Sequence, residues 1–252
     1  MPFSISTAYT SIDNPELYFQ AKTYSGTGSS NAITLDGSED MQPDMIWLKS
    51  RTNAEWHTLY DSVRGAASNY KQLYPNDANV EVTPATSGLT AIGTDGFTLG
   101  ANDNSNNSSE TFIAWCWKET ATAGFDIVGY TGNATDDVDI SHSLSAVPHV
   151  IIVKNRDNTN NESWAVYHHK NTSAPETDKL ALNTTAATTD DNEFWSDEVP
   201  TSSVFTIGRQ DQVNTSSGNH IAYLWSEKQG YSKFGSYTGN GNADGPFVYT
   251  GF

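Results

Sequence analysis

The chain has 252 residues, of which 13 are basic and 30 are acidic, so its formal net charge is −17. A surface this acidic repels the phosphate backbone of nucleic acids and anionic membranes, so neither is expected as a partner. Aromatic residues make up 12% of the chain and charged residues only 17%, while Asn, Thr, Ser and Gly supply much of the polarity. Long amphipathic helical runs are missing, and this composition predicts an all-β fold.

The N-terminal stretch MPFSISTAYT lacks the basic and long apolar segments of a signal peptide, and no apolar run approaches the roughly 20 residues of a membrane span. We therefore expect a protein made in the cytoplasm, without membrane insertion. Cys116 is the only cysteine, which excludes an intrachain disulfide. Because it lies in the apolar run TFIAWCW, we expect a small buried hydrophobic residue and not a nucleophile.

Residues 1–18 have no counterpart elsewhere in the chain and are predicted to form an N-terminal attachment arm. Within this arm, Asn14 followed by Pro15 is typical of a helix cap with proline at the first helical position, so a short helix should begin there. A second, weaker helical pattern covers residues 66–74, AASNYKQLY.

Two long segments of the chain repeat each other. QPDMIWLKSR matches VPHVIIVKNR at an offset of 105 residues, and both DGFTLG with SVFTIG and FIAWCW with HIAYLW match at 108. The openings YSGTG, YTGNA and YTGNG recur at offsets of 106 and 107. Matches in the same order at nearly one offset indicate a duplication. They predict two tandem antiparallel β-sandwich repeats of jelly-roll or lectin-like type, at residues 19–123 and 124–229.

The central strands expected in each repeat are apolar at consecutive positions, as in MIWLK and VIIVK. One face of such a strand packs inside its own sandwich, so the other face must meet a neighbouring repeat, a subunit or a loop. The side chains expected to be buried are Ile46, Leu48, Phe97, Ile113, Trp115 and Trp117 in the first repeat, and Ile151, Val153, Phe205, Ile221, Tyr223 and Trp225 in the second.

The C-terminal segment, residues 230–252, matches the opening of the repeats. Its sequence is GYSKFGSYTGNGNADGPFVYTGF. Either these residues are the opening strands of a third repeat, or they are edge strands added to the second repeat through backbone hydrogen bonds. A lone two-stranded hairpin is not stable in water, so we expect this segment to be ordered and paired with the second repeat.

The phrases PDMIWLKSR, LYDSVRG, DGFTLG and FIAWCWK, together with the C-terminal segment, resemble a module found in tandem in virion proteins of marine tailed bacteriophages. Such proteins are usually described as tail-fibre or structural proteins, and the module has no assigned activity. The resemblance therefore implies a lectin-like or jelly-roll sandwich and brings no catalytic residues with it.

The function expected from this resemblance is a virion tail fibre or adhesin that displays its modules for attachment to a host-surface glycan. The alternatives are a capsid-surface decoration or head-fibre protein and a polysaccharide depolymerase. The expected partners are other virion proteins, through the N-terminal arm, further copies of the chain in a homo-oligomer, and a host-cell glycan.

Six residues are candidates for ligand binding because they recur at matched places in the two repeats. The four cations are spaced by two along strands, so each pair points to one face and could hold an anionic sugar. The alternative is salt bridges to nearby acids such as Asp61 or Asp157, which is a commoner role at strand ends. The two tryptophans could stack on sugars or anchor the cores, and the core role is the commoner one. The six are Lys49, Arg51, Lys154, Arg156, Trp56 and Trp164.

No residue pattern predicts catalysis. The acids and histidines considered lie in no catalytic motif and in no metal-ligand spacing such as H-E-x-x-H. The acidic run around Asp136 favours a solvated turn over a calcium site. We therefore predict neither an enzyme nor a bound metal or cofactor. The groups considered are Glu55, Asp61, Glu110, Glu162, His142, His149, His168 and His169.

Overall fold

The computed structural model describes residues 10–67, 69–84, 86–157 and 162–250. In these residues the chain forms mainly antiparallel β-sheet, and its helices are only three or four residues long. No helix in the described part of the chain is long and apolar enough to cross a lipid bilayer. The predicted all-β fold is confirmed.

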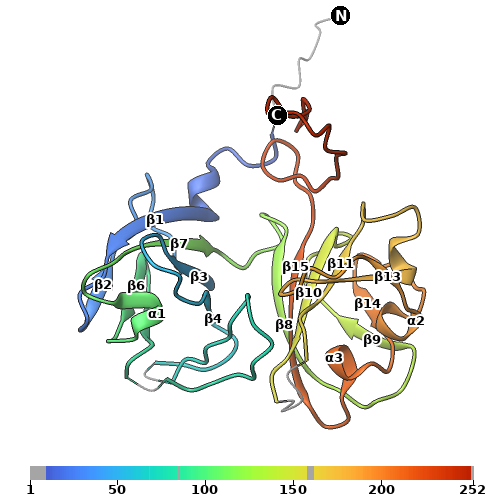
Figure 1. Ribbon diagram of the computed structural model, residues 1–252, viewed down its shortest axis with the longest axis horizontal. Helices are drawn as coiled ribbons and strands as arrows, with labels where there is room; N and C mark the ends of the chain where they lie inside the picture. The colour runs from blue at the N-terminus through green and yellow to red at the C-terminus, as the bar shows by residue number, and fades with distance from the viewer. Residues whose placement is uncertain (1–9, 68, 85, 158–161, 251–252) are drawn as a thin grey trace, which may run out of the picture.

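The first half of the structure, β1 to β7, contains two sheets with strand orders β1-β7-β3-β4 and β2-β6-β5 (Figure 1). Side chains from both sheets form one hydrophobic core, which includes Ile46, Leu48, Phe97 and the thiol of Cys116. Cys116 is thus a buried hydrophobic residue, as expected. The elements are η1 (Pro15–Leu17), β1 (Phe19–Ser25), β2 (Asn31–Ile33), β3 (Met45–Ser50), β4 (Thr58–Asp61), β5 (Leu89–Gly93), β6 (Gly96–Leu99), α1 (Asp103–Asn106) and β7 (Thr111–Trp117).

The second half, β8 to β15, has a larger sheet of order β13-β12-β11-β10-β15-β8 and a strand pair β14-β9. Its own core contains Ile151, Val153 and Phe205, as expected. The elements are β8 (Phe125–Thr131), β9 (Val138–Ser141), β10 (Val150–Asn155), β11 (Ala165–His168), η2 (Pro175–Thr177), β12 (Asp178–Ala181), β13 (Thr189–Asp190), α2 (Asn192–Trp195), β14 (Val204–Ile207), α3 (Asp211–Asn214) and β15 (Asn219–Trp225).

The strand order of the first half recurs in the second. The order β1-β7-β3-β4 corresponds to β8-β15-β10-β11, and the registers agree as well. Ile46 lies opposite Cys116, and the matched Ile151 lies opposite Leu224. Segments that match in sequence therefore occupy the same places in the two larger sheets.

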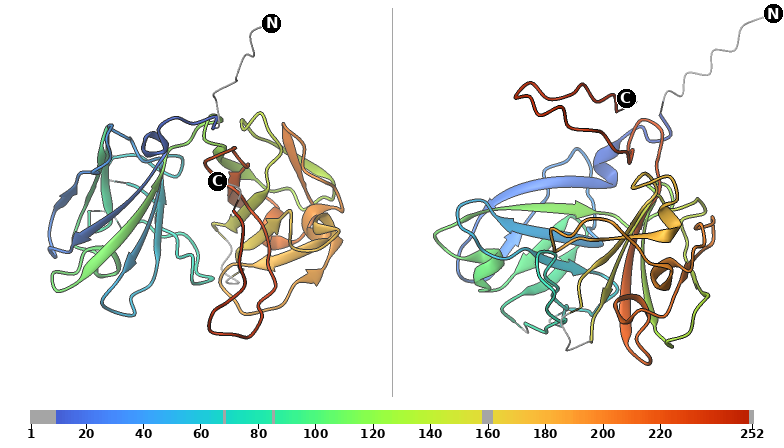
Figure 2. Two further views of the ribbon diagram at one scale, coloured as in Figure 1. Left: turned by 90° about the horizontal axis from the view of Figure 1, so that it is seen from above. Right: turned by 45° about the vertical axis from the view of Figure 1, so that its right-hand side comes forward.

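The two halves lie side by side (Figure 2). A third hydrophobic cluster lies between them, and we call this region the seam. From β3 it receives Met45 and Trp47, and from β10 it receives Ile152. The other residues of these strands, such as Leu48 and Val153, face the core of their own half. Both faces of β3 and β10 are thus covered, the second by the opposite half, as the consecutive apolar runs indicated.

The burial expected for three residues of β7 and one of β15 is wrong. Ile113, Trp115, Trp117 and Trp225 are only half-buried, whereas Phe112, Ala114 and Cys116 are fully covered. Successive side chains of a strand point to opposite faces, so only alternate residues of FIAWCW can enter the core of the first half.

The short helix at the N-terminal arm is confirmed: Asn14 Oδ1 accepts a hydrogen bond from the backbone N–H of Glu16 at 3.1 Å and caps η1. Residues 1–9 of the arm lie outside the described residues. The helix predicted at residues 66–74 is absent from their described part. Gln72 and Leu73 instead form isolated β-bridges with Val82 and Leu59, because these neighbouring extended segments satisfy their backbone groups.

Residues 233–250 contain no strand, and Phe247 is 93% exposed. The prediction that this segment adds edge strands to the second repeat is therefore wrong. β15 lies between β10 and β8, so the chain that leaves it has no free sheet edge beside it. It turns away towards the N-terminal segment, where the backbone N–H of Ser11 donates to the carbonyl of Gln229 at 3.3 Å (Figure 2).

Candidate functional site

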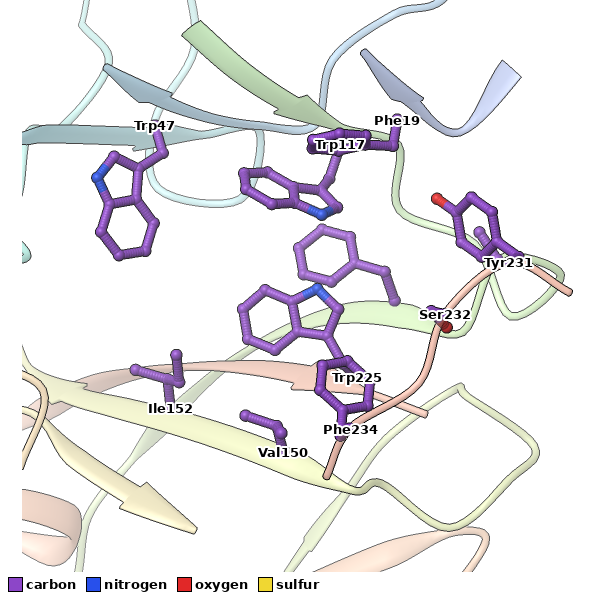
Figure 3. Close-up of a pocket in the computed structure, with 11 residues that line it drawn as sticks. Phe19, Trp47, Trp117, Val150, Ile152, Trp225, Tyr231, Ser232 and Phe234 are labelled. Atoms are coloured by element: carbon purple, nitrogen blue, oxygen red, sulfur yellow. The ribbon is translucent and has the colours of Figure 1, made fainter. Parts of the chain in front are cut away.

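An open pocket lined by aromatic side chains lies at one end of the seam (Figure 3). Its volume is about 400 Å³, which is enough for one or two small rings. We call it the aromatic pocket. It is lined by Phe19, Trp47, Trp117, Ala123, Phe125, Val150, Ile152, Trp225, Tyr231, Ser232 and Phe234.

Two matching rows of side chains build the main walls of this pocket. In the first half the register places Phe19 opposite Trp117, which in turn lies opposite Met45; Phe19 and Trp117 line the pocket, whereas Met45 is buried in the seam. In the second half the equivalent row runs from Phe125 through Trp225 to Val150. Residues opposite each other in a sheet share a face, so each row presents its side chains to the other half.

The rings of the two rows contact one another across the seam. The Trp117 and Trp225 ring centroids are 6.4 Å apart with the planes at 72°, an edge-to-face arrangement. Phe19 packs on Trp117 at 4.9 Å and Phe125 on Trp225 at 5.0 Å. These contacts fix the indole rings, so the pocket is preformed.

The segment after β15 supplies a third wall, with Tyr231, Ser232 and Phe234. It is turned onto the pocket at Gly230, whose φ of +75° lies in the left-handed region. A Cβ at this glycine would lie 2.6 Å from Thr10 Cβ, so a larger residue would force the turn away from the N-terminal segment. Burial raises the pKa of Tyr231 to about 12, so its phenol keeps its proton at neutral pH.

The pocket is equipped to bind by stacking and by hydrogen-bond donation. The described residues that line it include no carboxylate, imidazole or thiol. Within the described residues, the indole N–H groups of Trp117 and Trp225 have no hydrogen-bond partner, so both can donate to a ligand. Such a site recognises faces of rings and acceptor oxygens, and it contains none of the usual groups for acid–base or nucleophilic chemistry.

The six residues singled out in the sequence do not line this pocket. Lys49 Nζ donates to the carbonyls of Ser50 and Asn53, at 2.8 and 3.0 Å, and Arg51 is exposed. Trp56 is 41% exposed and packs edge-to-face on Tyr74 at 5.1 Å, so its predicted role as a core anchor is wrong. It lies in a loop outside the strands, where no second layer covers it.

Two of their counterparts in the second half, Trp164 and Lys154, are buried in the seam. Trp164 is fully buried, and its Nε1 donates to the carbonyls of Tyr74 and Asp77 in the first half, at 3.0 and 3.1 Å. Lys154 Nζ donates to the carbonyl of Ala78 at 2.7 Å, and burial lowers the pKa of Lys154 to about 8. These side chains connect the halves, and as ligand-binding residues they stay a prediction.

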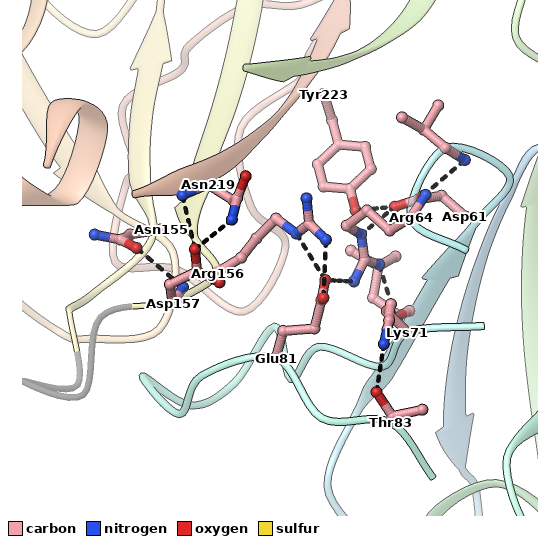
Figure 4. A network of polar contacts seen from close by, with 12 residues as sticks. Asp61, Arg64, Lys71, Glu81, Thr83, Asn155, Arg156, Asp157, Asn219 and Tyr223 are labelled. Carbon is pink, nitrogen blue, oxygen red and sulfur yellow. Dashed lines mark hydrogen bonds and ion pairs between the residues drawn. The ribbon is translucent and has the colours of Figure 1, made fainter. Parts of the chain in front are cut away.

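Arg156 belongs to a polar network that crosses the seam (Figure 4). Its Nε and Nη2 donate to the two carboxylate oxygens of Glu81, at 2.8 and 2.9 Å, and Glu81 also accepts from Arg64 Nη1 at 2.9 Å. Arg64 Nε in turn donates to Asp61 at 2.6 Å, and the hydroxyl of Tyr223 donates to the same carboxylate at 2.5 Å.

The acids named from the sequence as salt-bridge partners have other roles. Asp61 is paired with Arg64, and Asp157 accepts from the backbone and side chain of Asn219. The ion pair of Arg156 is therefore with Glu81, from the opposite half, and not with a residue at its own strand end.

A family model described as a domain of unknown function, DUF7483, matches residues 14–252. The chain belongs to the DUF7483 family. No curated protein and no solved structure matches it.

Sequence reasoning missed the aromatic pocket of this DUF7483 protein because it assigned Trp117 and Trp225 to the cores. A usable signal was present: Trp117 and Trp225 recur at an offset of 108, and Phe19 and Phe125 at 106. Alternation along FIAWCW places Trp117 on the face opposite Cys116. The third wall had no such signal, because Tyr231 and Phe234 reach the pocket only through the turn at Gly230.

A half-buried carboxyl group on the connection between the halves of the DUF7483 chain should make its stability depend on pH. Burial and a hydrogen bond with Asp126 raise the pKa of Glu119 to about 7, and the charge of Asp44 acts in the same direction. Because the pKa in the folded state lies above the ordinary value of 4.5, protonation stabilises the fold. This stabilisation is complete below about pH 4.5 and is lost as the pH rises through about 7.

We expect the melting temperature of the wild type to fall more between about pH 5.5 and pH 8 than that of Glu119→Gln. The glutamine side chain is neutral and can keep the bond to Asp126 at both pH values. Glu198→Gln, at an exposed position, is the control and should behave as the wild type. Equal slopes for the wild type and Glu119→Gln in thermal melts would contradict the assignment.

Proposed function

We propose that this chain is a virion structural protein of tail-fibre or adhesin type, and that it binds a host-surface glycan in the aromatic pocket without cleaving it. The observation that carries the proposal is the preformed set of indole rings at the seam, with Trp117 and Trp225 6.4 Å apart and open to solvent. The resemblance of the repeated phrases to tandem modules of marine phage virion proteins supports the biological setting.

The architecture that goes with this proposal is two tandem β-sandwich repeats of jelly-roll or lectin-like type. The shared strand order, the equivalent registers and the sequence offsets of 105 to 108 residues support a duplication. In this arrangement residues 1–18 attach the protein to other virion proteins, and the two repeats together present one pocket.

The pocket favours a neutral glycan. Sugar rings have apolar faces that stack on indole rings, and their hydroxyl oxygens accept hydrogen bonds from the N–H groups of Trp117 and Trp225. No cationic side chain is found among the described residues that line the pocket, and the net charge of −17 opposes an anionic ligand.

The test is a screen of the chain against an array of bacterial surface oligosaccharides, followed by titration of each binding sugar with tryptophan fluorescence as the readout. We expect Trp117→Ala to weaken binding by about 2 kcal/mol, roughly 30-fold, as is typical of a central tryptophan in a binding site. Trp56→Ala removes an exposed tryptophan outside the pocket and should leave the affinity unchanged.

Two results would overturn the proposal. One is an array without any binding sugar, or a sugar that binds Trp117→Ala as tightly as the wild type. The other is shortening of the bound oligosaccharide during incubation, measured by mass spectrometry, which would make the chain a depolymerase.

A further inference from the structure

Three potential metal ligands meet at one corner of the second half: His149, His169 and Glu227. One donor atom from each lies within 4.8 Å of the other two. The imidazole rings of the two histidines are 4.4 Å apart between centroids, and Glu227 Oε1 is 3.6 Å from His169 Nε2. All three side chains are half-buried, so they are held in place and still reachable from solvent.

The order of the strands brings these residues together. β11, β10 and β15 are neighbours in the sheet, with Val150 of β10 opposite both His168 of β11 and Trp225 of β15. His149 directly precedes β10 and His169 directly follows β11, while Glu227 lies two residues beyond Trp225 at the end of β15. Since adjacent strands lie about 4.8 Å apart, the three side chains meet at one end of these neighbouring strands.

Backbone contacts already orient each of the three groups. The backbone N–H of Glu227 donates to His149 Nδ1 at 3.1 Å, and the N–H of Phe234 donates to Glu227 Oε1 at 2.9 Å. His169 Nε2 lies 2.9 Å from the carbonyl oxygen of Phe234. With bonds of about 2.1 Å, two atoms bound to one ion lie roughly 3.0–3.4 Å apart, so this carbonyl is placed as a possible fourth ligand.

We propose that His149, His169 and Glu227 bind a divalent transition-metal ion, with Zn²⁺ as the representative case. Two imidazoles and one carboxylate are ligands that such ions accept, and they leave positions for the Phe234 carbonyl or for water. On binding, His169 Nε2 faces the ion without its proton, and the ring proton then lies on Nδ1.

The surroundings of the corner fit a bound cation. A hollow of about 450 Å³ next to it is lined in part by His149 and Glu227 and provides a path from solvent. Lys228 and Lys233 also line the hollow and weaken the attraction, while the net charge of −17 strengthens it.

The proposed ion would fasten the C-terminal segment to the sheet. Phe234 both contacts Glu227 and His169 through its backbone and lines the aromatic pocket with its side chain. An ion at this corner would therefore fix the third wall of the pocket. The metal site itself does not depend on the proposed glycan binding.

Among the described residues, the first half has no such cluster at the corresponding corner, which provides a matched control. Glu119 takes the place of Glu227 there, and its backbone N–H donates to an Asp44 carboxylate oxygen at 2.8 Å where Glu227 donates to His149. Glu119→Gln therefore changes the same residue type at the same corner of the other half. His142→Ala serves as a second control, because this half-buried histidine lies outside the cluster.

The experiment uses the 252-residue chain, purified without a histidine tag and treated with a chelator. Zn²⁺ affinity is measured by competition with a chromophoric chelator, and Co²⁺ is added separately to record its visible absorption bands. We expect one ion per chain. His169→Ala and Glu227→Gln should weaken binding by more than the roughly 10- to 100-fold typical of losing an outer-shell partner, while the two controls bind as the wild type.

A thermal melt of each variant without metal shows whether it is folded. Glu227→Gln keeps an acceptor for the Phe234 N–H, so it separates loss of a ligand from loss of structure. Zn²⁺ should raise the melting temperature of the wild type and not that of this variant. The proposal is overturned if the wild type binds no Zn²⁺ at micromolar concentrations, or if Glu227→Gln and His169→Ala bind it as tightly as the wild type.

Discussion

Replacing Trp164 with alanine is expected to lower the free energy of unfolding by about 3–5 kcal/mol. The indole is fully buried in the seam and packs near Tyr223, with ring centroids 6.5 Å apart. Its removal leaves a cavity between the halves and also takes the indole N–H away from the carbonyls of Tyr74 and Asp77, of which, among the described residues, only that of Tyr74 keeps a backbone donor, the N–H of Asp77. Equilibrium denaturation followed by circular dichroism measures the loss.

The matched control is Trp56→Ala. Trp56 is the equivalent residue of the first half but is 41% exposed, so its loss should cost less than about 1 kcal/mol. Trp164→Phe keeps an aromatic ring and loses only the N–H, so it should fall between the two. If Trp164→Ala unfolds at the same denaturant concentration as Trp56→Ala, the indole does not hold the halves together.

The local elements of this fold were readable from the sequence. Runs such as MIWLK and VIIVK predict strands because they are short, β-branched or aromatic, and bounded by turn residues. Their consecutive apolar residues also indicated a second packed layer, and the seam provides it. The same kind of pattern predicted strands in the C-terminal segment, and that prediction was wrong. The segment follows β15, which is a central strand, so no free sheet edge lies beside it.

The proposed metal cluster was harder to predict than the strands because its residues meet only through the order of the strands. His149, His169 and Glu227 are far apart in sequence and become neighbours only because β11, β10 and β15 are adjacent. The same holds for Glu81, which no pattern connects with Arg156. Local spacing reports on single strands and turns, whereas these groupings depend on which strands pair.

Duplicated positions also diverged in role. Lys49 and Lys154 match in the sequence, but Lys49 caps its own strand end, while Lys154 is buried and bonds to the carbonyl of Ala78. The difference arises because the first-half loop that contains Ala78 lies against the second half, next to Lys154. One half can supply a covering loop to the other. An alignment of the repeats treats the two halves as equivalent, so it does not show this difference.

Replacing Arg64 with methionine is expected to lower the free energy of unfolding by about 3–5 kcal/mol, because it leaves a buried carboxylate without its counter-charge. The side chains of Arg64 and Asp61 are both 0% exposed, with Nε and Oδ2 2.6 Å apart. Burial alone would lower the pKa of Arg64, but the charges of Asp61 and its neighbours raise it above the ordinary value, so the guanidinium stays charged. Urea denaturation at neutral pH measures the effect.

The control for a less buried pair is Arg156→Met. Arg156 is 20% exposed and its partner Glu81 11%, so water can replace part of the lost interaction, and the cost should be about 1 kcal/mol. Adding Asp61→Asn to Arg64→Met removes the unpaired charge and keeps an acceptor for the backbone N–H groups of residues 63 and 64, so it should recover part of the lost stability. If the double variant is less stable than Arg64→Met alone, the cost comes from lost packing and hydrogen bonds. The unpaired charge of Asp61 would then not be its source.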